Sequence, residues 1–331
     1  MTLPWLSVVV PSLGDQAKLV PLLDALTRQS LPRERFEVLV VLDGAGASSA
    51  LAARARALDV ELIRLERRAG PGAARNRGAL EARGEFLAFT EDDVAPAPDW
   101  LERAAARLEA EPSIDVLEGA TIEPGGRPIR RPAGDHPLYL PTNLFVRRAL
   151  FERLGGYCED FFDSGSGAYF REDSDLGFRL EEARARIARE TSAIVTHPRE
   201  HPRFLDPLRW ARRYEMDPLL ESRHPRLFRE RIEAHRWGPF LVRRPMVRAS
   251  LACVTAAVLA ALAGAAGSAR TAAALLGVGG AALVFIWAKW RFDPLRLPLL
   301  PLVPVVLIVA LLRGGRRLGR VRAGSGAVHR R

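Results

Sequence analysis

Short apolar runs alternate with segments of helical periodicity over the first ninety residues. Four runs are rich in β-branched or aromatic residues and have the length of buried strands. They are Leu6–Val10, Phe36–Leu42, Val60–Leu65 and Phe86–Phe89. Between them, apolar side chains recur every three or four residues over 16–30, 48–58 and 73–83. This alternation predicts an α/β fold in which parallel strands form one sheet and helices cover it.

The pattern continues less regularly to about residue 200. It predicts a helix from Trp100 to about Glu111, a strand near Ile114–Glu118 and another over Asn143–Val146. A longer helix is expected over Arg171–Arg189, and a short strand over Ala193–Thr196. The first 200 residues therefore predict one domain.

Polar residues stand directly after several of these strands. Pro11 and Ser12 follow the first, Asp43 follows the second, and Glu91, Asp92 and Asp93 follow the fourth. In parallel α/β sheets, ligands bind in the crevice beyond the carboxyl ends of the strands. We expect these residues to line such a crevice.

The run of three acids calls for a positive partner. Adjacent carboxylates repel one another, and burying them unpaired costs several kcal/mol. Mg²⁺ and Mn²⁺ prefer oxygen ligands and usually share them with substrate phosphates. A divalent metal carried with a nucleotide diphosphate is one interpretation of Glu91–Asp93. A solvated acidic loop, with Asp92 and Asp93 capping the turn before Pro96, is the other.

Six segments in order resemble the family 2 inverting glycosyltransferases, which have a GT-A fold, over roughly residues 5–200. They read SVVVPS, VLVVLDGAG, GPGAARNRG, FTEDDV, NLFVRRALFERLGGY and REDSDLGFRL. Each is a weak signal alone, and the order and spacing of all six make the resemblance strong. It implies a nucleotide-diphosphate sugar as donor and an enzyme that uses Mn²⁺ or Mg²⁺.

The resemblance also implies roles on the nucleotide side. Pro11 and Ser12 would lie along the nucleotide, and Asp43 would recognise its base. Arg75 and Asn76 would contact the nucleotide, although both also suit capping and ion pairing of their own helix.

On the metal side, Glu91 and Asp93 match the acidic pair that binds metal and diphosphate. His197, after the last predicted strand, resembles a family histidine that contacts the metal or the diphosphate, or it is a polar loop residue. Two positions depart from the family pattern: Leu42 replaces an aspartate beside Asp43, and Glu91 is longer than the usual aspartate. Asp92 is a candidate to compensate in nucleotide binding, so the division of roles among the three acids is open.

An inverting transfer needs a base that takes the proton of the acceptor hydroxyl. The resemblance assigns this role to Asp173, with Glu172 beside it as the second member of the catalytic pair. Acids in a first helical turn also favour the helix dipole and cap its amides. Asp175 fits that structural role better, because Arg179 lies one turn further on.

The last 130 residues have another character. Apolar stretches cover about 251–269, 271–288 and 295–312, each near the ~20 residues that span a bilayer. The net charge is −6 over residues 1–200 and +16 over 201–331. Because the basic excess flanks apolar segments, membrane phosphates are the expected partner rather than nucleic acid.

The expected organisation is a catalytic domain over 1–200, an interfacial amphipathic linker over 201–250, membrane segments over 251–312 and a basic tail over 313–331. Basic groups flank the first segment, the link to the third and the end of the chain. By the positive-inside rule, two spans with a re-entrant third segment would keep them all in the cytoplasm. Three full spans are the alternative. The first residues read as a strand and not as a signal peptide, so the catalytic domain is expected to face the cytoplasm.

The leading hypothesis is a membrane-attached, metal-dependent glycosyltransferase that acts on a lipid-linked or cell-envelope glycan acceptor. A nucleotidyltransferase is the enzymatic alternative, but PSLGDQAK is a poor phosphate loop. An inactive, glycosyltransferase-like membrane scaffold is the other, and the departures at Leu42 and Glu91 are its support. The two cysteines, Cys158 and Cys253, suggest neither a disulfide framework nor a zinc site.

Overall fold

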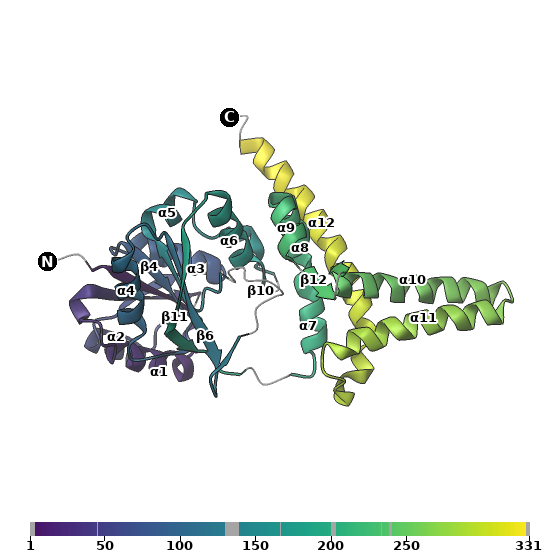
Figure 1. The fold of residues 1–331 in the computed structure, drawn as a ribbon, viewed down its shortest axis with the longest axis horizontal. Helices are drawn as coiled ribbons and strands as arrows, with labels where there is room; N and C mark the ends of the chain where they lie inside the picture. Colours follow the sequence, from purple (N-terminus) through teal and green to yellow (C-terminus); the bar gives the residue numbers. More distant parts are fainter. Residues whose placement is uncertain are drawn as a thin grey trace. The chain divides into compact units, whose positions relative to one another are not determined.

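The computed structural model describes residues 4–44, 46–129, 139–165, 167–199, 203–232, 234–237 and 240–328. It divides into one compact unit within residues 1–200 and a second that holds residues 201–331 (Figure 1).

A mostly parallel sheet forms the centre of the first unit. In the part of the chain that the structure describes it has nine strands, in the order β3-β2-β1-β4-β8-β6-β11-β5, with β7 paired to β6. The strands are β1 (Leu6–Ser12), β2 (Phe36–Asp43), β3 (Glu61–Leu65), β4 (Phe86–Phe89), β5 (Ala95–Pro96), β6 (Val116–Glu123), β7 (Arg127–Pro128), β8 (Leu144–Arg147) and β11 (Ile187–Thr196). The α/β fold predicted from the sequence is confirmed.

Helices cover both faces of this sheet (Figure 1). They are α1 (Gln16–Thr27), α2 (Ser49–Ala57), α3 (Pro71–Glu81), α4 (Trp100–Ala110), α5 (Arg148–Arg153) and α6 (Glu172–Glu182), with short 3₁₀ turns η1 (Arg33–Arg35) and η2 (Glu159–Phe161) and a small hairpin of β9 (Phe162–Asp163) and β10 (Ala168–Tyr169). Successive side chains of β1 enter opposite cores: Val8 packs in the cluster that contains α1 and α4, and Val9 in the cluster that contains α3 and α6. Burial on both faces explains why the strand is a continuous apolar run.

The strand predicted over Asn143–Val146 is confirmed as β8, and it runs antiparallel to both of its neighbours, β4 and β6. One local prediction was wrong. The helix expected to reach Arg189 ends at Glu182, after which Arg184 adopts a left-handed conformation with φ 57°. The strand β11 then begins at Ile187, which pairs with Val116 of β6. Sheet pairing overrides the helical propensity of this Ala- and Arg-rich segment.

The second unit consists largely of helices. These are α7 (Asp206–Arg212), η3 (Arg213–Met216), α8 (Asp217–Arg223), α9 (Pro225–Arg231), α10 (Pro245–Ala265), α11 (Ala269–Ala288), η4 (Pro294–Leu299) and α12 (Leu302–Val328), with a hairpin of β12 (Ala234–Trp237) and β13 (Phe240–Arg243). A core that includes Tyr214, Met246, Ile286 and Leu307 joins the residues expected to form a linker to the apolar helices. The interfacial position of residues 201–250 stays a prediction.

Helices α10 and α11 form a hairpin (Figure 1). Their contact is close, because a Cβ placed on Gly279 would lie 3.6 Å from the Cβ of Ala256. Among the helices that the structure describes, these two are long and apolar enough to cross a bilayer, with mean hydropathies of 1.9 and 2.0. Large side chains such as Leu262 and Leu276 are 62% and 61% exposed. The third apolar stretch, 295–312, is divided between η4 and the first part of α12.

Candidate active site

The ends of β1 and β4 meet through a direct side-chain contact. The hydroxyl of Ser12, the last residue of β1, donates to Oδ2 of Asp92 at 2.6 Å. Pro11 is buried within β1 opposite Val41 of β2. The structure thus brings Ser12 and the acidic run to the same edge of the sheet, as the strand pattern predicted.

Asp43 at the end of β2 holds the turn that starts α3. Its two carboxylate oxygens accept from the backbone N–H groups of Ala69 at 2.6 Å and Gly70 at 2.9 Å. Gly70 has φ 93°, a conformation that a residue with a Cβ adopts only with strain. This anchor fixes where α3 begins, and so where Arg75 lies.

Glu91, Asp93 and His197 form a compact group with metal-ligand chemistry. One ligand atom from each lies within 4.8 Å of the other two. His197 comes directly after β11, and its backbone N–H donates to the carbonyl of Ile122 in β6 at 2.9 Å. Its Nε2 lies 3.4 Å from Oε2 of Glu91 and 3.9 Å from Oδ1 of Asp93. Residues about one hundred positions apart therefore meet at one sheet edge.

The second ring nitrogen of His197 orients the imidazole. Nδ1 lies 2.8 Å from the carbonyl oxygen of Pro198, so Nδ1 carries a hydrogen and Nε2 faces the acids. The hydrogen bond with Glu91 raises the pKa of His197 to about 9. Two carboxylates and an imidazole nitrogen suit Mn²⁺ or Mg²⁺, and a bound cation would require the neutral ring.

Glu91 has several partners that stabilise its charge. Thr142 donates its hydroxyl to Oε2 of Glu91 at 2.9 Å, and Nη2 of Arg75 lies 3.7 Å from Oε1. Burial by itself would raise the pKa of Glu91, but the hydrogen bond with His197, the charge of Arg75 and the bond from Thr142 outweigh it and lower the pKa. Glu91 is therefore ionised at neutral pH.

The other two acids of the run differ from Glu91 in their surroundings. Burial raises the pKa of Asp92, against the hydrogen bond from Ser12. Asp93 pairs with Lys18 of α1, whose Nζ lies 3.0 Å from Oδ2. Besides His197, which faces both Glu91 and Asp93, each acid thus has a partner of its own: Thr142 for Glu91, Ser12 for Asp92 and Lys18 for Asp93.

The two carboxyl groups at the start of α6, Glu172 and Asp173, both have raised pKa values. Glu172 is buried, and burial followed by the charge of Asp173 raises its pKa to about 7. Burial also raises the pKa of Asp173, although the backbone N–H of Ser174 donates to it at 2.6 Å. The preceding Arg171 has φ 77°, a left-handed conformation that is costly for a residue with a side chain and is typical of functional sites. This pair suits proton exchange near neutral pH.

Arg75 connects the two acidic groups. Arg75 is buried on α3. This helix lies close to β1, because a Cβ on Gly78 would be only 2.5 Å from Cγ1 of Val9 and only glycine leaves the room. The charge of Arg75 lowers the pKa of Glu91 and opposes the raised pKa values of Glu172 and Asp173.

Three buried donor groups at this point, on two residues that the structure describes, lack partners. Nε and Nη1 of Arg75 make no hydrogen bond, and neither does the hydroxyl of Tyr157, whose ring lies 5.4 Å from the guanidinium carbon of Arg75. Buried polar atoms are almost always paired, so these donors indicate a ligand or water.

Asn76 and Asp175 hold the turn that carries Tyr157. The amide of Asn76 donates to the carbonyl of Tyr157 at 2.9 Å and accepts from its N–H at 2.7 Å. Asp175 pairs with Arg179 at 2.7 Å, as predicted, and Arg179 donates to the carbonyl of Gly156 at 2.6 Å. In the structure, both side chains are engaged with protein groups.

Sequence reasoning missed Lys18, Thr142 and Tyr157. Lys18 had one available signal, since it is one of two lysines in a chain with 49 basic residues. The sequence around Thr142 and Tyr157 gives no such signal. Thr142 contacts Glu91, which is 51 positions away, and Tyr157 contacts Arg75, which is 82 positions away.

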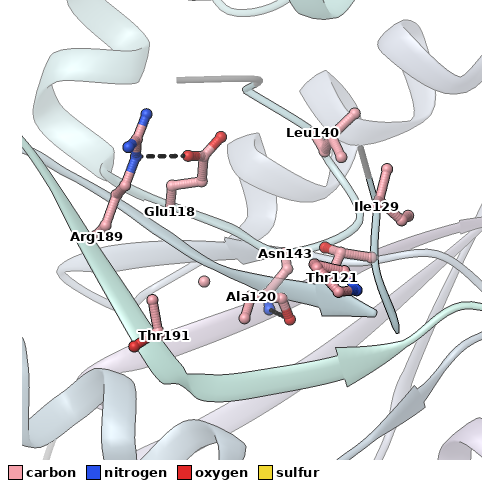
Figure 2. Close-up of a pocket in the computed structure, with 10 residues that line it drawn as sticks. Glu118, Ala120, Thr121, Ile129, Leu140, Asn143, Arg189 and Thr191 are labelled. Carbon is pink, nitrogen blue, oxygen red and sulfur yellow. Dashed lines mark hydrogen bonds and ion pairs between the residues drawn. The ribbon is translucent and has the colours of Figure 1, made fainter. Parts of the chain in front are cut away.

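A pocket of about 260 Å³ lies between β6 and β11 (Figure 2). It opens where pairing between the two strands is interrupted after Glu190. The ion pair between Glu118 and Arg189, at 3.3 Å, stands on its wall. Asn143 also lines it and follows Thr142, the partner of Glu91. None of the residues predicted for the site lines this pocket.

Known proteins give a consistent comparison. The model of the family "Glycosyl transferase family 2" matches residues 7–176. Glycosyltransferase AglE of Haloferax volcanii is 28% identical over 196 residues, which are 54% of this chain and 64% of that protein. Succinoglycan biosynthesis protein ExoO of Rhizobium meliloti is 33% identical over 155 residues, 43% of this chain and 42% of that protein. The chain thus spans less than two thirds of either relative.

Two solved structures share the fold. One is residues 1–349 of Staphylococcus aureus TarS with UDP, with a TM-score of 0.53, 20% identity, and coverage of 95% of this chain and 92% of that one. The other is the mannosyltransferase PcManGT of Pyrobaculum calidifontis with GDP-Man and Mn²⁺, with a TM-score of 0.55, 20% identity, and coverage of 94% and 88%. The GT-A fold implied by the sequence resemblance is confirmed.

Proposed function

The chain belongs to glycosyl transferase family 2, and on that premise we propose that it transfers a sugar from a nucleotide-diphosphate sugar to a lipid-linked or cell-envelope glycan by an inverting single displacement. The observation that carries this proposal is the Glu91–Asp93–His197 group, joined through Arg75 to the carboxyl pair of α6. One cluster suits a cation and the other suits a proton, and a metal-assisted transfer needs both.

In this proposal, Glu91, Asp93 and His197 hold Mn²⁺ or Mg²⁺. A cation bound there would neutralise the charge that builds on the leaving diphosphate. The unpaired N–H groups of Arg75 are available to the same anion. The complexes of PcManGT with GDP-Man and Mn²⁺, and of TarS with UDP, support a nucleotide-diphosphate donor.

The nucleotide itself is assigned to the strand ends. Ser12 and Asp92, already bonded to each other, are placed beside the ribose, with Pro11 below them. Asp43 is placed at the base, because a carboxylate that accepts two backbone bonds keeps further lone pairs. Asn76 acts here by positioning Tyr157 rather than by direct contact.

Asp173 is the proposed base. Glu172 lies beside it, and the charge of each carboxyl group affects the protonation of the other. The acceptor oxygen forms a bond to the anomeric carbon while the bond from that carbon to the diphosphate oxygen breaks. The electron pair leaves with the nucleoside diphosphate, and the hydroxyl proton passes to the carboxylate of Asp173. The raised pKa of this carboxyl makes it a stronger base than an exposed aspartate.

The names of two relatives and the apolar helices of the second unit support a lipid-linked or cell-envelope glycan as acceptor. ExoO is a succinoglycan biosynthesis protein, and TarS is a poly(ribitol-phosphate) β-N-acetylglucosaminyltransferase, 33% identical over 114 residues. The exposed apolar surface of the α10–α11 hairpin would lie in the bilayer, with the catalytic unit in the cytoplasm. Since the third apolar stretch is divided between η4 and α12, the structure supports two spans over three.

A panel of nucleotide sugars tests the catalytic proposal. Full-length protein in detergent, with Mn²⁺, should show a raised unfolding temperature with one donor class, and EDTA should remove the shift. Transfer of the sugar to membrane extracts of the source cell should follow with the same donor. A protein that binds a donor yet transfers nothing to any acceptor fraction supports the scaffold alternative. Absence of binding across the panel contradicts the proposal.

The membrane proposal has a separate test. The full-length protein should resist extraction by carbonate and high salt and should require detergent. After Cys158 and Cys253 are replaced by serine, Ala266→Cys in the α10–α11 turn should react with an impermeant maleimide from outside the cell. A reporter at the C-terminus should be cytoplasmic for two spans, and an external reporter would contradict the hairpin.

A further inference from the structure

Lys18 occupies the edge of the proposed metal group. It lies in the first turn of α1, whose N-terminus is capped by the side chain of Asp15. Its Nζ is 3.0 Å from Oδ2 of Asp93, while the other oxygen of Asp93 is 3.9 Å from His197. Asp93 therefore has a cation on either side, and one of its ligand oxygens is bonded to an ammonium group.

The choice of lysine at this position is unusual for this chain. Lys18 and Lys289 are the only lysines among its 49 basic residues, and every other basic residue of 1–200 is arginine. An arginine would bind a carboxylate through a rigid planar fork. Lysine is a compact point charge on a flexible stem, with three rotatable donors. Such a side chain can leave one anion for another at little cost.

The contact is also weak enough to be exchanged. The Lys18 side chain is 48% exposed and that of Asp93 is 26% exposed. Exposed ion pairs contribute little, because water screens the charges and two long side chains must be held in one geometry. A divalent cation held by Glu91, Asp93 and His197 would repel the ammonium and take over the charge of Asp93. A diphosphate brought to the same place would offer it new oxygen acceptors.

We propose that Lys18 is an exchangeable counter-cation, which neutralises Asp93 in the metal-free protein and moves to an oxygen of the donor diphosphate when metal and nucleotide bind. This inference rests on the proposed function. It assigns to Lys18 two opposite effects. Lys18 competes with the metal when no nucleotide is present, and it contributes to nucleotide affinity once the metal is bound.

Lys18→Met separates these effects in binding experiments on the full-length protein in detergent. With Mn²⁺ alone, measured by calorimetry or by the electron paramagnetic resonance of free Mn²⁺, the variant should bind roughly two- to fivefold more tightly. At saturating Mn²⁺, UDP and GDP should each be tested, and the one that binds wild type should bind the variant roughly three- to tenfold more weakly. Lys18→Arg keeps the charge but holds the carboxylate through a fork, so it should bind Mn²⁺ no more tightly than wild type.

Arg28→Met is the matched control, because it removes one exposed positive charge at the opposite end of α1. It should change neither affinity. Unchanged Mn²⁺ affinity in Lys18→Met overturns the competition, and unchanged nucleotide affinity overturns the move to the diphosphate. Either result with normal wild-type binding leaves the proposed function intact. A wild type that binds no Mn²⁺ overturns the metal site itself, and this inference with it.

Discussion

Two glutamates in the same site are held in opposite electrostatic states. Glu91 lies beside His197, Thr142 and Arg75, and these partners lower its pKa despite burial. Glu172 is buried next to Asp173, and burial with that like charge raises its pKa to about 7. Glu91 is thus held as an anion after strand β4. Glu172, at the start of helix α6, can gain or lose a proton near neutral pH.

The difference follows from the partners that each element supplies. After β4, a hydroxyl before β8, an imidazole after β11 and a guanidinium on α3 surround Glu91, so its charge is matched and a cation site results. At the start of α6 the hydrogen bonds from Ser174 and the charges of Arg171 and Arg75 favour the ionised form of Asp173, but burial outweighs them. Arg75 serves both clusters, and its attraction is insufficient to offset burial at Glu172. One cluster is therefore suited to hold metal and the other to exchange a proton.

Asp173→Asn should produce the largest effect. Asparagine has nearly the same shape but cannot take a proton at neutral pH. Single-turnover transfer at saturating donor should fall by roughly 10²–10⁴-fold, while donor binding stays normal because the other cluster holds it. Asp175→Asn is the control: it breaks the buried pair with Arg179 and should lower the unfolding temperature, with little change in transfer by folded enzyme. Near-normal transfer by Asp173→Asn would eliminate it as the base.

Asp93→Asn tests the proposed metal site. Loss of a charged ligand oxygen should weaken Mn²⁺ binding by at least about 100-fold and remove the Mn²⁺-dependent part of nucleotide affinity. Titration calorimetry measures both affinities. Asp99→Asn, which removes a partly exposed carboxylate paired with Arg103, should leave both unchanged. Wild-type Mn²⁺ affinity in Asp93→Asn would contradict the metal site.

Two isosteric substitutions should shift stability in opposite directions. At pH 8, Glu91→Gln removes a carboxylate whose ionised form the fold favours, and should destabilise the protein. Glu172→Gln removes one whose ionised form the fold disfavours, and should stabilise it; each effect is expected to be about 1–2 kcal/mol, or a few degrees in unfolding temperature.

The effect of Glu172 on stability should depend on pH. The folded-state pKa of about 7 lies above the ordinary carboxyl value, so the carboxyl gains a proton in the folded protein as the pH falls through 7. The advantage of Glu172→Gln should therefore shrink between pH 8 and pH 5. Thermal unfolding at both pH values measures it. Destabilisation by both substitutions at pH 8 would remove the electrostatic contrast between the clusters.

Thr142→Val should have a smaller effect on metal binding than the loss of a metal ligand. It removes the hydroxyl that bonds Glu91 at 2.9 Å without changing any metal ligand. Partners of metal ligands typically contribute 10–100-fold in affinity, and for one neutral hydroxyl we expect about tenfold weaker Mn²⁺ binding. Thr121→Val, on β6 at the pocket wall, is the control. If both valine variants bind Mn²⁺ equally well, Thr142 does not orient Glu91.

The sequence by itself determined the parallel strands of the sheet, the polar residues at their ends and the two long apolar helices. Runs such as Leu6–Val10 are buried on both faces, and that requirement appears directly in their composition. Strand ends carry Ser12, Asp43 and Glu91, so their convergence follows from parallel topology alone. The apolar helices α10 and α11 could be predicted for the same reason, because length and hydropathy are local properties of a chain.

Only the tertiary structure decided how charge is distributed over the site. Asp43 and Asn76 were predicted as ligand contacts, and in the fold each bonds to backbone groups of a neighbouring turn. The antiparallel direction of β8 and the early end of α6 depend on pairing with strands distant in sequence. The pKa values of Glu91 and Glu172 diverge because Arg75, Thr142 and His197 arrive from other elements. Electrostatic interactions depend on distance in space, which a local pattern of residues does not contain.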